Sequence, residues 1–309
     1  MENQSTKTQL FGKFSNLKLF QINEHTIMVV LAVVVGVAAG LGAVGFRHLI
    51  NFFQTLAYGA ENDLLELVVN LPWYYRVAVP VIGGLIVGPL VYFFAREAKG
   101  HGVPEVMEAV ALKSGVIRKR VVVVKSLASA ISISTGGSVG REGPIVQIGS
   151  AIGSVLGQFM KLSPDRMRTL VGCGAAAGIA ATFNAPIAGS MFALEVVLGD
   201  FGLATFSPIV ISSVVATAIS RAFLGDVPAF IVPAYELVSG WELPMYLVLG
   251  IFCAAVGVTF TKTLYRIEDL FDGFKIPEYL KGIIGGLILG AASLVFPQIL
   301  GVGYGALDP

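Results

Sequence analysis

Long apolar runs, interrupted by short polar breaks, set the pattern of this chain. An α-helix of about 20 residues crosses the roughly 30 Å of hydrocarbon in a bilayer. We therefore predict membrane-spanning helices at residues 27–58, 77–95, 207–223 and 244–272. Residues 1–26 are polar, and we interpret them as a cytosolic tail. We do not expect a cleaved signal peptide here, because the apolar run that follows is longer than a signal-peptide core.

Other apolar segments are too short to cross a membrane and are separated by glycine and proline turns. Examples are residues 121–134, a helix that we expect to start at Pro144, and another that starts at Pro186. Irregular backbone at membrane depth is stable only where it is buried in protein or lines a cavity. Broken helices of this kind are typical of transporters and channels. The pattern predicts an all-α, polytopic membrane protein.

Composition agrees with this pattern. The 309 residues are 55% hydrophobic and 13% charged, whereas soluble domains are typically about 25% charged. We expect the surplus apolar surface to face membrane lipid. A net charge of +1 without a basic tract gives no indication of a nucleic-acid partner. Cys173 and Cys253 both lie in apolar segments, so we interpret them as packing residues and not as a disulfide.

An internal repeat divides the chain. The sequence Ile-Gly-Gly-Leu-Ile-Val-Gly at 82–88 recurs as Ile-Gly-Gly-Leu-Ile-Leu-Gly 202 residues later, at 284–290. A long apolar run precedes each copy and a glycine turn follows it. Chance is the alternative, because such short motifs are common in apolar helices. We predict a first repeat at 27–235 and the start of a second at 236–309, which we expect to be incomplete.

The stretch 137–149 holds the strongest chemical signal. Glu142 follows Arg141 and stands between Gly140 and Gly143, just before Pro144. A charged side chain at membrane depth costs about 2.5–3.5 kcal/mol on insertion scales and usually has a function. The N-terminus of a helix attracts anions through its free N–H groups. The stretch predicts an acid that competes with an anion for a positive helix end; a salt bridge between Glu142 and Arg141 is the structural alternative.

Three motifs carry a family resemblance: Gly-Arg-Glu-Gly-Pro at 140–144, Gly-His-Gly-Val-Pro at 100–104 and Phe-Asn-Ala-Pro-Ile-Ala-Gly at 183–189. Across residues 27–309 the chain resembles the ClC family of chloride channels and chloride/proton antiporters. The resemblance implies a ClC-type inverted repeat with one anion pore per subunit and a homodimer. It also implies chloride or a similar small anion as ligand, with no cofactor, no metal and no enzymatic activity.

The resemblance assigns roles to individual residues. Glu142 matches the family's gating glutamate. Lys125 matches a lysine near the anion pathway, although a lysine that reaches to the membrane interface is the alternative. We expect the Arg141 side chain to pair with Glu105. The predicted anion-binding residues, whose contribution is mainly backbone N–H groups, are Gly100, His101, Gly102, Gly140, Arg141, Glu142 and Gly143.

Two positions depart from the family pattern. His101 stands where the family usually has a serine, so its imidazole could contact the anion or turn away from it. Val196 stands where the antiporters carry their internal proton-transfer glutamate, and the adjacent Glu195 points about 100° further around an α-helix. We therefore favour a channel, with an antiporter that uses another internal proton path as the alternative. Tyr304 does not match the family's tyrosine at the central anion site.

Other classes fit less well. The glycine-rich segments at 136–140 and 172–174 lack the preceding strand that a dinucleotide-binding loop requires. A non-transporting membrane scaffold would not need a carboxylate in a glycine turn. The basic segment 113–120 and the N-terminal tail are expected to face the cytosol by the positive-inside rule. We expect a plasma membrane or a bacterial inner membrane as the location.

Overall fold

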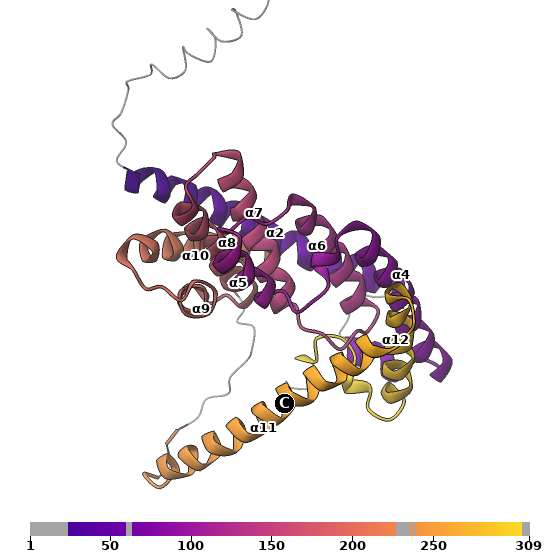
Figure 1. Ribbon diagram of the computed structural model, residues 1–309. Coiled ribbons are helices and arrows are strands. Elements are labelled where there is room, and N and C mark those ends of the chain that lie inside the picture. The colour runs from indigo at the N-terminus through magenta and orange to yellow at the C-terminus, as the bar shows by residue number, and fades with distance from the viewer. Residues whose placement is uncertain (1–23, 60–63, 227–235, 238, 305–309) are drawn as a thin grey trace, which may run out of the picture.

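The computed structural model describes residues 24–59, 64–226, 236–237 and 239–304, and within these ranges the chain forms helices and no strand (Figure 1). The all-α prediction is therefore confirmed for the described residues. Most of the expected tail, 1–26, lies outside them. The helices are α2 (Glu24–Tyr58), α3 (Leu64–Val69), α4 (Trp73–Phe94), α5 (Val103–Leu112), α6 (Lys119–Ser134), α7 (Glu142–Phe159), α8 (Pro164–Phe183), α9 (Pro186–Phe192), α10 (Leu203–Leu224), α11 (Glu242–Gly273) and α12 (Glu278–Ser293).

Four of these helices, α2, α4, α10 and α11, are long and apolar enough to cross a membrane, which agrees with the four predicted spans. The helices between them are shorter and end at irregular turns, as the glycine and proline pattern indicated. Short 3-10 turns, η1 (Arg96–Ala98) and η3 (Pro297–Ile299), follow α4 and α12. Helix α7 begins at Glu142, so the expectation that Pro144 is its first residue was wrong by two positions.

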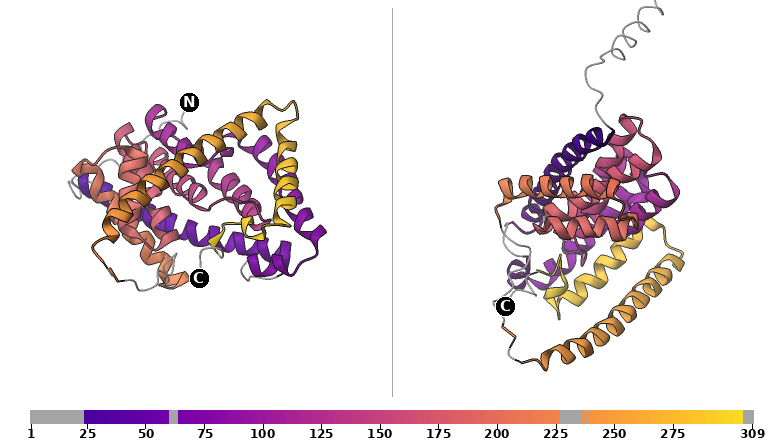
Figure 2. Two further views of the ribbon diagram at one scale, coloured as in Figure 1. Left: turned by 90° about the horizontal axis from the view of Figure 1, so that it is seen from below. Right: turned by 90° about the vertical axis from the view of Figure 1, so that its left-hand side faces the viewer.

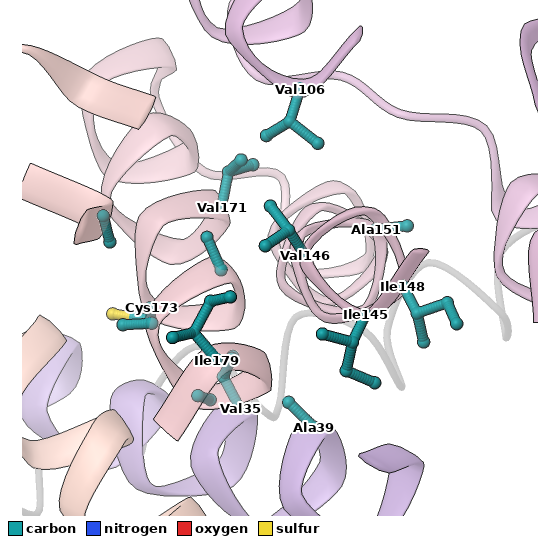
Figure 3. Packing of buried hydrophobic residues seen from close by; sticks show 14 of the residues in the cluster. Val35, Ala39, Val106, Ile145, Val146, Ile148, Ala151, Val171, Cys173 and Ile179 are labelled. Atoms are coloured by element: carbon teal, nitrogen blue, oxygen red, sulfur yellow. The ribbon is translucent and has the colours of Figure 1, made fainter. Parts of the chain in front are cut away.

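The core forms where α8 packs against α7, α2 and α10 (Figure 3). Small residues let α7 and α8 touch through their backbones. A Cβ added at Gly149 would collide with the carbonyl oxygen of Gly174, and the reverse is also true. Such close approach excludes lipid and is common between membrane helices. Ile145 and Val146 of α7 fill the space beside this contact and are fully buried.

The two copies of the repeated motif lie on α4 and α12, and these helices pack antiparallel against each other (Figures 1 and 2). Gly84 touches Gly282, and Gly286 touches Pro80. The two contacts are related by the repeat spacing of 202 residues: position 84 of the first contact corresponds to 286 in the second, and position 282 corresponds to 80.

The same operation converts the contact of Gly88 with Tyr279 into the contact of Gly290 with Val77. Contacts that exchange in this way are the signature of a pseudo-two-fold axis between two inverted repeats. The packing of α4 and α12 therefore agrees with the inverted-repeat fold.

Helix α11 lies along one side of the bundle and buries none of its residues (Figure 2). Its C-terminal end returns to the turn after α4. There Asp272 accepts a hydrogen bond from Lys99 at 3.0 Å, and Lys281 of α12 lies 3.8 Å from the same carboxylate. This end of α11 closes one side of the cleft described next.

Candidate functional site

A cleft of about 980 Å³ opens between the two glycine turns that precede α5 and α7. Parts of α4, α6, α11 and α12 complete its walls. The cleft brings together most of the residues that the sequence singled out, although they come from three separate segments. Those on its walls are Gly100, His101, Lys125, Gly140, Glu142 and Gly143.

The two glycine turns touch through their backbones. A Cβ added at Gly102 would collide with the carbonyl oxygen of Gly143, and one added at Gly143 would collide with that of His101. Gly102 also has a φ of 98°, which favours glycine. The turns therefore fix the N-termini of α5 and α7 next to each other, with the positive ends of both helices at one place.

Glu105 supports the first turn from within. Its Oε2 accepts a hydrogen bond from the N–H of Gly102 at 2.6 Å, and its other oxygen lies close to Gly100. This bond is the glutamate half of a capping box at the start of α5, since Gly102 has no side chain to form the other half. The expectation that Glu105 pairs with Arg141 was therefore wrong. The Arg141 guanidinium instead lies over the ring of Tyr304, 4.9 Å from its centroid.

Lys125 is buried in α6, with 5% of its surface exposed. Its Nζ donates hydrogen bonds to the carbonyl oxygens of Ala98 at 3.0 Å and Gly100 at 2.9 Å. The alternative of a lysine reaching to the membrane interface is thus wrong. Through these hydrogen bonds Lys125 stabilises the turn before α5, and it places a positive charge beside the cleft.

Glu142, half-buried at the first position of α7, faces both the glycine turn and the C-terminal part of the chain. Its Oε1 accepts a hydrogen bond from the hydroxyl of Tyr304 at 2.7 Å. Its Oε2 lies so close to Gly140 that a Cβ there would collide with it. The carboxylate therefore folds back over the glycine turn. Sequence reasoning missed Tyr304, because no local spacing connects two residues that are 162 positions apart.

His101 faces α11. Its Nε2 lies 3.5 Å from Oε2 of Glu268, and its ring stands edge-on to Tyr265 with 6.0 Å between the ring centroids. The imidazole is also 45% exposed at the cleft. The ring of His101 therefore borders the cleft, where it could contact an anion, but its Nε2 is directed at the carboxylate of Glu268.

Val196 and Glu195 lie elsewhere, in a single π-helical turn, η2 (Ala193–Leu198). Both line a second cavity of about 1000 Å³. The two side chains are consecutive in the sequence and both border this cavity. The far half of α5, through Met107 and Val110, lines this cavity too. Helix α5 thus leads from the turn of the first cleft to the wall of the second cavity.

The fold is that of a polytopic membrane protein of transporter type, with inverted repeats. Its broken helices meet at a charged cleft. The chain belongs to the family described as voltage gated chloride channel, whose model matches residues 83–308. Members of this family are channels and transporters.

Two curated relatives support the family assignment. A ClcB-like protein of Ralstonia nicotianae is 36% identical over 91% of this chain and 66% of its own length. The H(+)/Cl(-) exchange transporter ClcA of Citrobacter koseri is 33% identical over 93% of this chain and 62% of its own length. The chain thus spans less than two thirds of the length of these relatives.

Among solved structures, a slow cyanobacterial Cl-/H+ antiporter matches with a TM-score of 0.78 and 28% identity, over 91% of this chain and 66% of that one. A CLC-type fluoride/proton antiporter matches the fold with a TM-score of 0.77 at 24% identity, over 94% of this chain and 72% of that one. These matches agree with the predicted ClC-type architecture.

Proposed function

We propose that this protein moves chloride, or a similar small anion, across a membrane along a path through the cleft, and that Glu142 is the gate. The observation that carries the proposal is the position of the Glu142 carboxylate at the first residue of α7, within the cleft. A helix N-terminus carries roughly half a positive charge and binds anions. The carboxylate and a permeant anion would compete for that place, so anions pass when the carboxylate leaves.

The surrounding groups suit an anion. Buried Lys125 adds a full positive charge beside the cleft. In the proposed path, Gly100, Gly140 and Gly143 have no side chain of their own, so their backbone can approach the anion once the Glu142 carboxylate has left. Gly102 and the Arg141 side chain are not directed at the anion in the proposed path. The Gly102 amide is engaged by Glu105 and positions the turn, and the Arg141 side chain lies over Tyr304.

We favour a channel over an antiporter. Val196 occupies the position of the antiporters' internal proton-transfer glutamate, and valine cannot carry a proton. The antiporter remains the second candidate, since Glu195 opens into the same cavity as Val196 and the C. koseri relative is named as an exchange transporter. Movement of protons coupled to chloride distinguishes the two.

The charge distribution supports the orientation expected from sequence. Gln158, near the end of α7, donates to the carbonyl oxygen of Ile117 at 2.8 Å, and Gly115 packs against Met167. The basic segments 113–120 and 161–168 therefore lie together at the end of α7 opposite Glu142. By the positive-inside rule this end faces the cytosol. We propose a homodimer in a plasma membrane or bacterial inner membrane, with Glu142 towards the outside.

Replacing the gate tests the proposal. Glu142→Ala should raise chloride efflux from liposomes that contain the full-length protein, and should abolish its dependence on external pH. Glu108→Ala is the matched control, because Glu108 is an exposed carboxylate on α5 that pairs with Lys113 at 2.8 Å, outside the cleft. Unchanged flux and pH dependence in Glu142→Ala would remove Glu142 from the mechanism.

A further inference from the structure

The loop after η3 is fastened to the segment that leads to Glu142. The N–H of Gly301 donates a hydrogen bond to the carbonyl oxygen of Gly136 at 3.1 Å. Leu300 is 5% exposed, and a Cβ at Gly136 would lie 3.2 Å from its Cδ2. A loop of the second repeat is therefore held beside the proposed gate, which belongs to the first.

Tyr304 is the residue of this loop that reaches the gate. Its hydroxyl donates to Oε1 of Glu142 at 2.7 Å, and its ring lies under the Arg141 guanidinium. The pKa of Tyr304 is raised to about 12, mainly because the hydroxyl is buried and secondly because it is hydrogen-bonded to Glu142. The hydroxyl therefore keeps its proton at physiological pH. A hydrogen bond to a charged acceptor is stronger than one between neutral groups.

We propose that the Tyr304 hydroxyl is a latch that holds the Glu142 carboxylate over the Gly140 turn, and thereby sets how often the anion path opens. This inference rests on the gating role proposed for Glu142. Tyr304 is a positioning residue, since it contacts the gate and acts on the anion only through it. The carboxylate lies between Gly140 on one side and the Tyr304 hydroxyl on the other, so it leaves the turn only when the hydrogen bond breaks.

Tyr304→Phe isolates the hydroxyl, because phenylalanine keeps a ring under Arg141. Tyr58→Phe is a matched control. The Tyr58 hydroxyl is also buried next to Gly136, but it has no hydrogen-bond partner among the described residues. The readout is the initial rate of chloride efflux from liposomes containing the full-length protein, with single-peak elution in detergent to verify folding. Loss of a hydrogen bond to a charged group should raise the rate by about tenfold in Tyr304→Phe, and Tyr58→Phe should match wild type.

A double-variant cycle separates a latch from a general structural role. In the Glu142→Ala background, adding Tyr304→Phe should change the rate no further, because the hydroxyl has lost its acceptor. Wild-type flux in Tyr304→Phe, or an equal increase in both backgrounds, would overturn the latch while leaving the gate intact. If Glu142→Ala itself behaves as wild type, the gating role of Glu142 is rejected, and the role proposed for Tyr304 is rejected with it.

Discussion

Replacement of Lys125 by methionine removes one ammonium group while keeping a side chain of similar length. In the structure this ammonium donates to two carbonyl oxygens, those of Ala98 and Gly100, and it is buried. Each hydrogen bond from a charged group contributes about 1.5–3 kcal/mol. Relief from burying the charge offsets part of the loss, so we expect a net destabilisation of about 1–3 kcal/mol.

The same change should reduce anion transport. A unit charge about 8 Å from an anion, at an effective dielectric constant of about 20, contributes about 2 kcal/mol. Chloride flux at low chloride concentration should therefore fall by roughly thirtyfold, and more chloride should be needed for half-maximal flux. Chloride efflux from liposomes and thermal unfolding in detergent measure the two effects separately.

Lys119→Met is the matched control, because Lys119 lies on the same helix but is exposed. It should leave both flux and thermal stability close to wild type. If Lys125→Met behaves like this control in both assays, Lys125 neither fixes the turn nor contributes to the anion path. A loss of stability with unchanged chloride dependence would limit Lys125 to a structural role.

Two further predictions concern the same site. Gly143→Ala should destabilise the protein by about 1–3 kcal/mol through overpacking, because the added Cβ collides with the carbonyl oxygen of His101; thermal unfolding in detergent measures this, and a wild-type midpoint would contradict the contact between the turns. Tyr304 should contribute stability that is complete below about pH 10, its ordinary pKa, and is lost as the pH rises to about 12, because its pKa is raised in the folded protein. Unfolding measured across this range should show a smaller loss in Tyr304→Phe, and identical profiles would argue against the raised pKa.

Residues close together in the sequence were the ones whose environment could be predicted. The apolar runs predicted the four long helices, and the glycine motifs at 100–104 and 140–144 predicted two turns that feed helices. These features depend on local spacing and on the length needed to cross a membrane. The repeat at 82–88 and 284–290 also agrees with the packing of α4 against α12, since related surfaces can pack around one axis.

Contacts between distant segments could not be predicted in the same way. Tyr304 reaches Glu142 only because η3 and the following loop fold back onto Gly136. Glu105 was assigned the wrong partner because its own helix start offered a nearer donor, the N–H of Gly102. The π turn at Ala193–Leu198 is a further feature that the spacing of apolar residues did not predict. Tertiary packing decides the Tyr304 contact, whereas the Glu105 contact is local and could have been found from the spacing of a helix N-terminus.

The central claim is that this protein conducts anions through the cleft at Glu142. Its most direct test records chloride efflux and proton movement together in liposomes that contain the full-length protein, under a chloride gradient without a proton gradient. The channel account predicts chloride efflux without coupled proton movement. Proton movement in fixed proportion to chloride would establish the antiporter instead, and efflux no faster than from empty liposomes would contradict anion transport altogether.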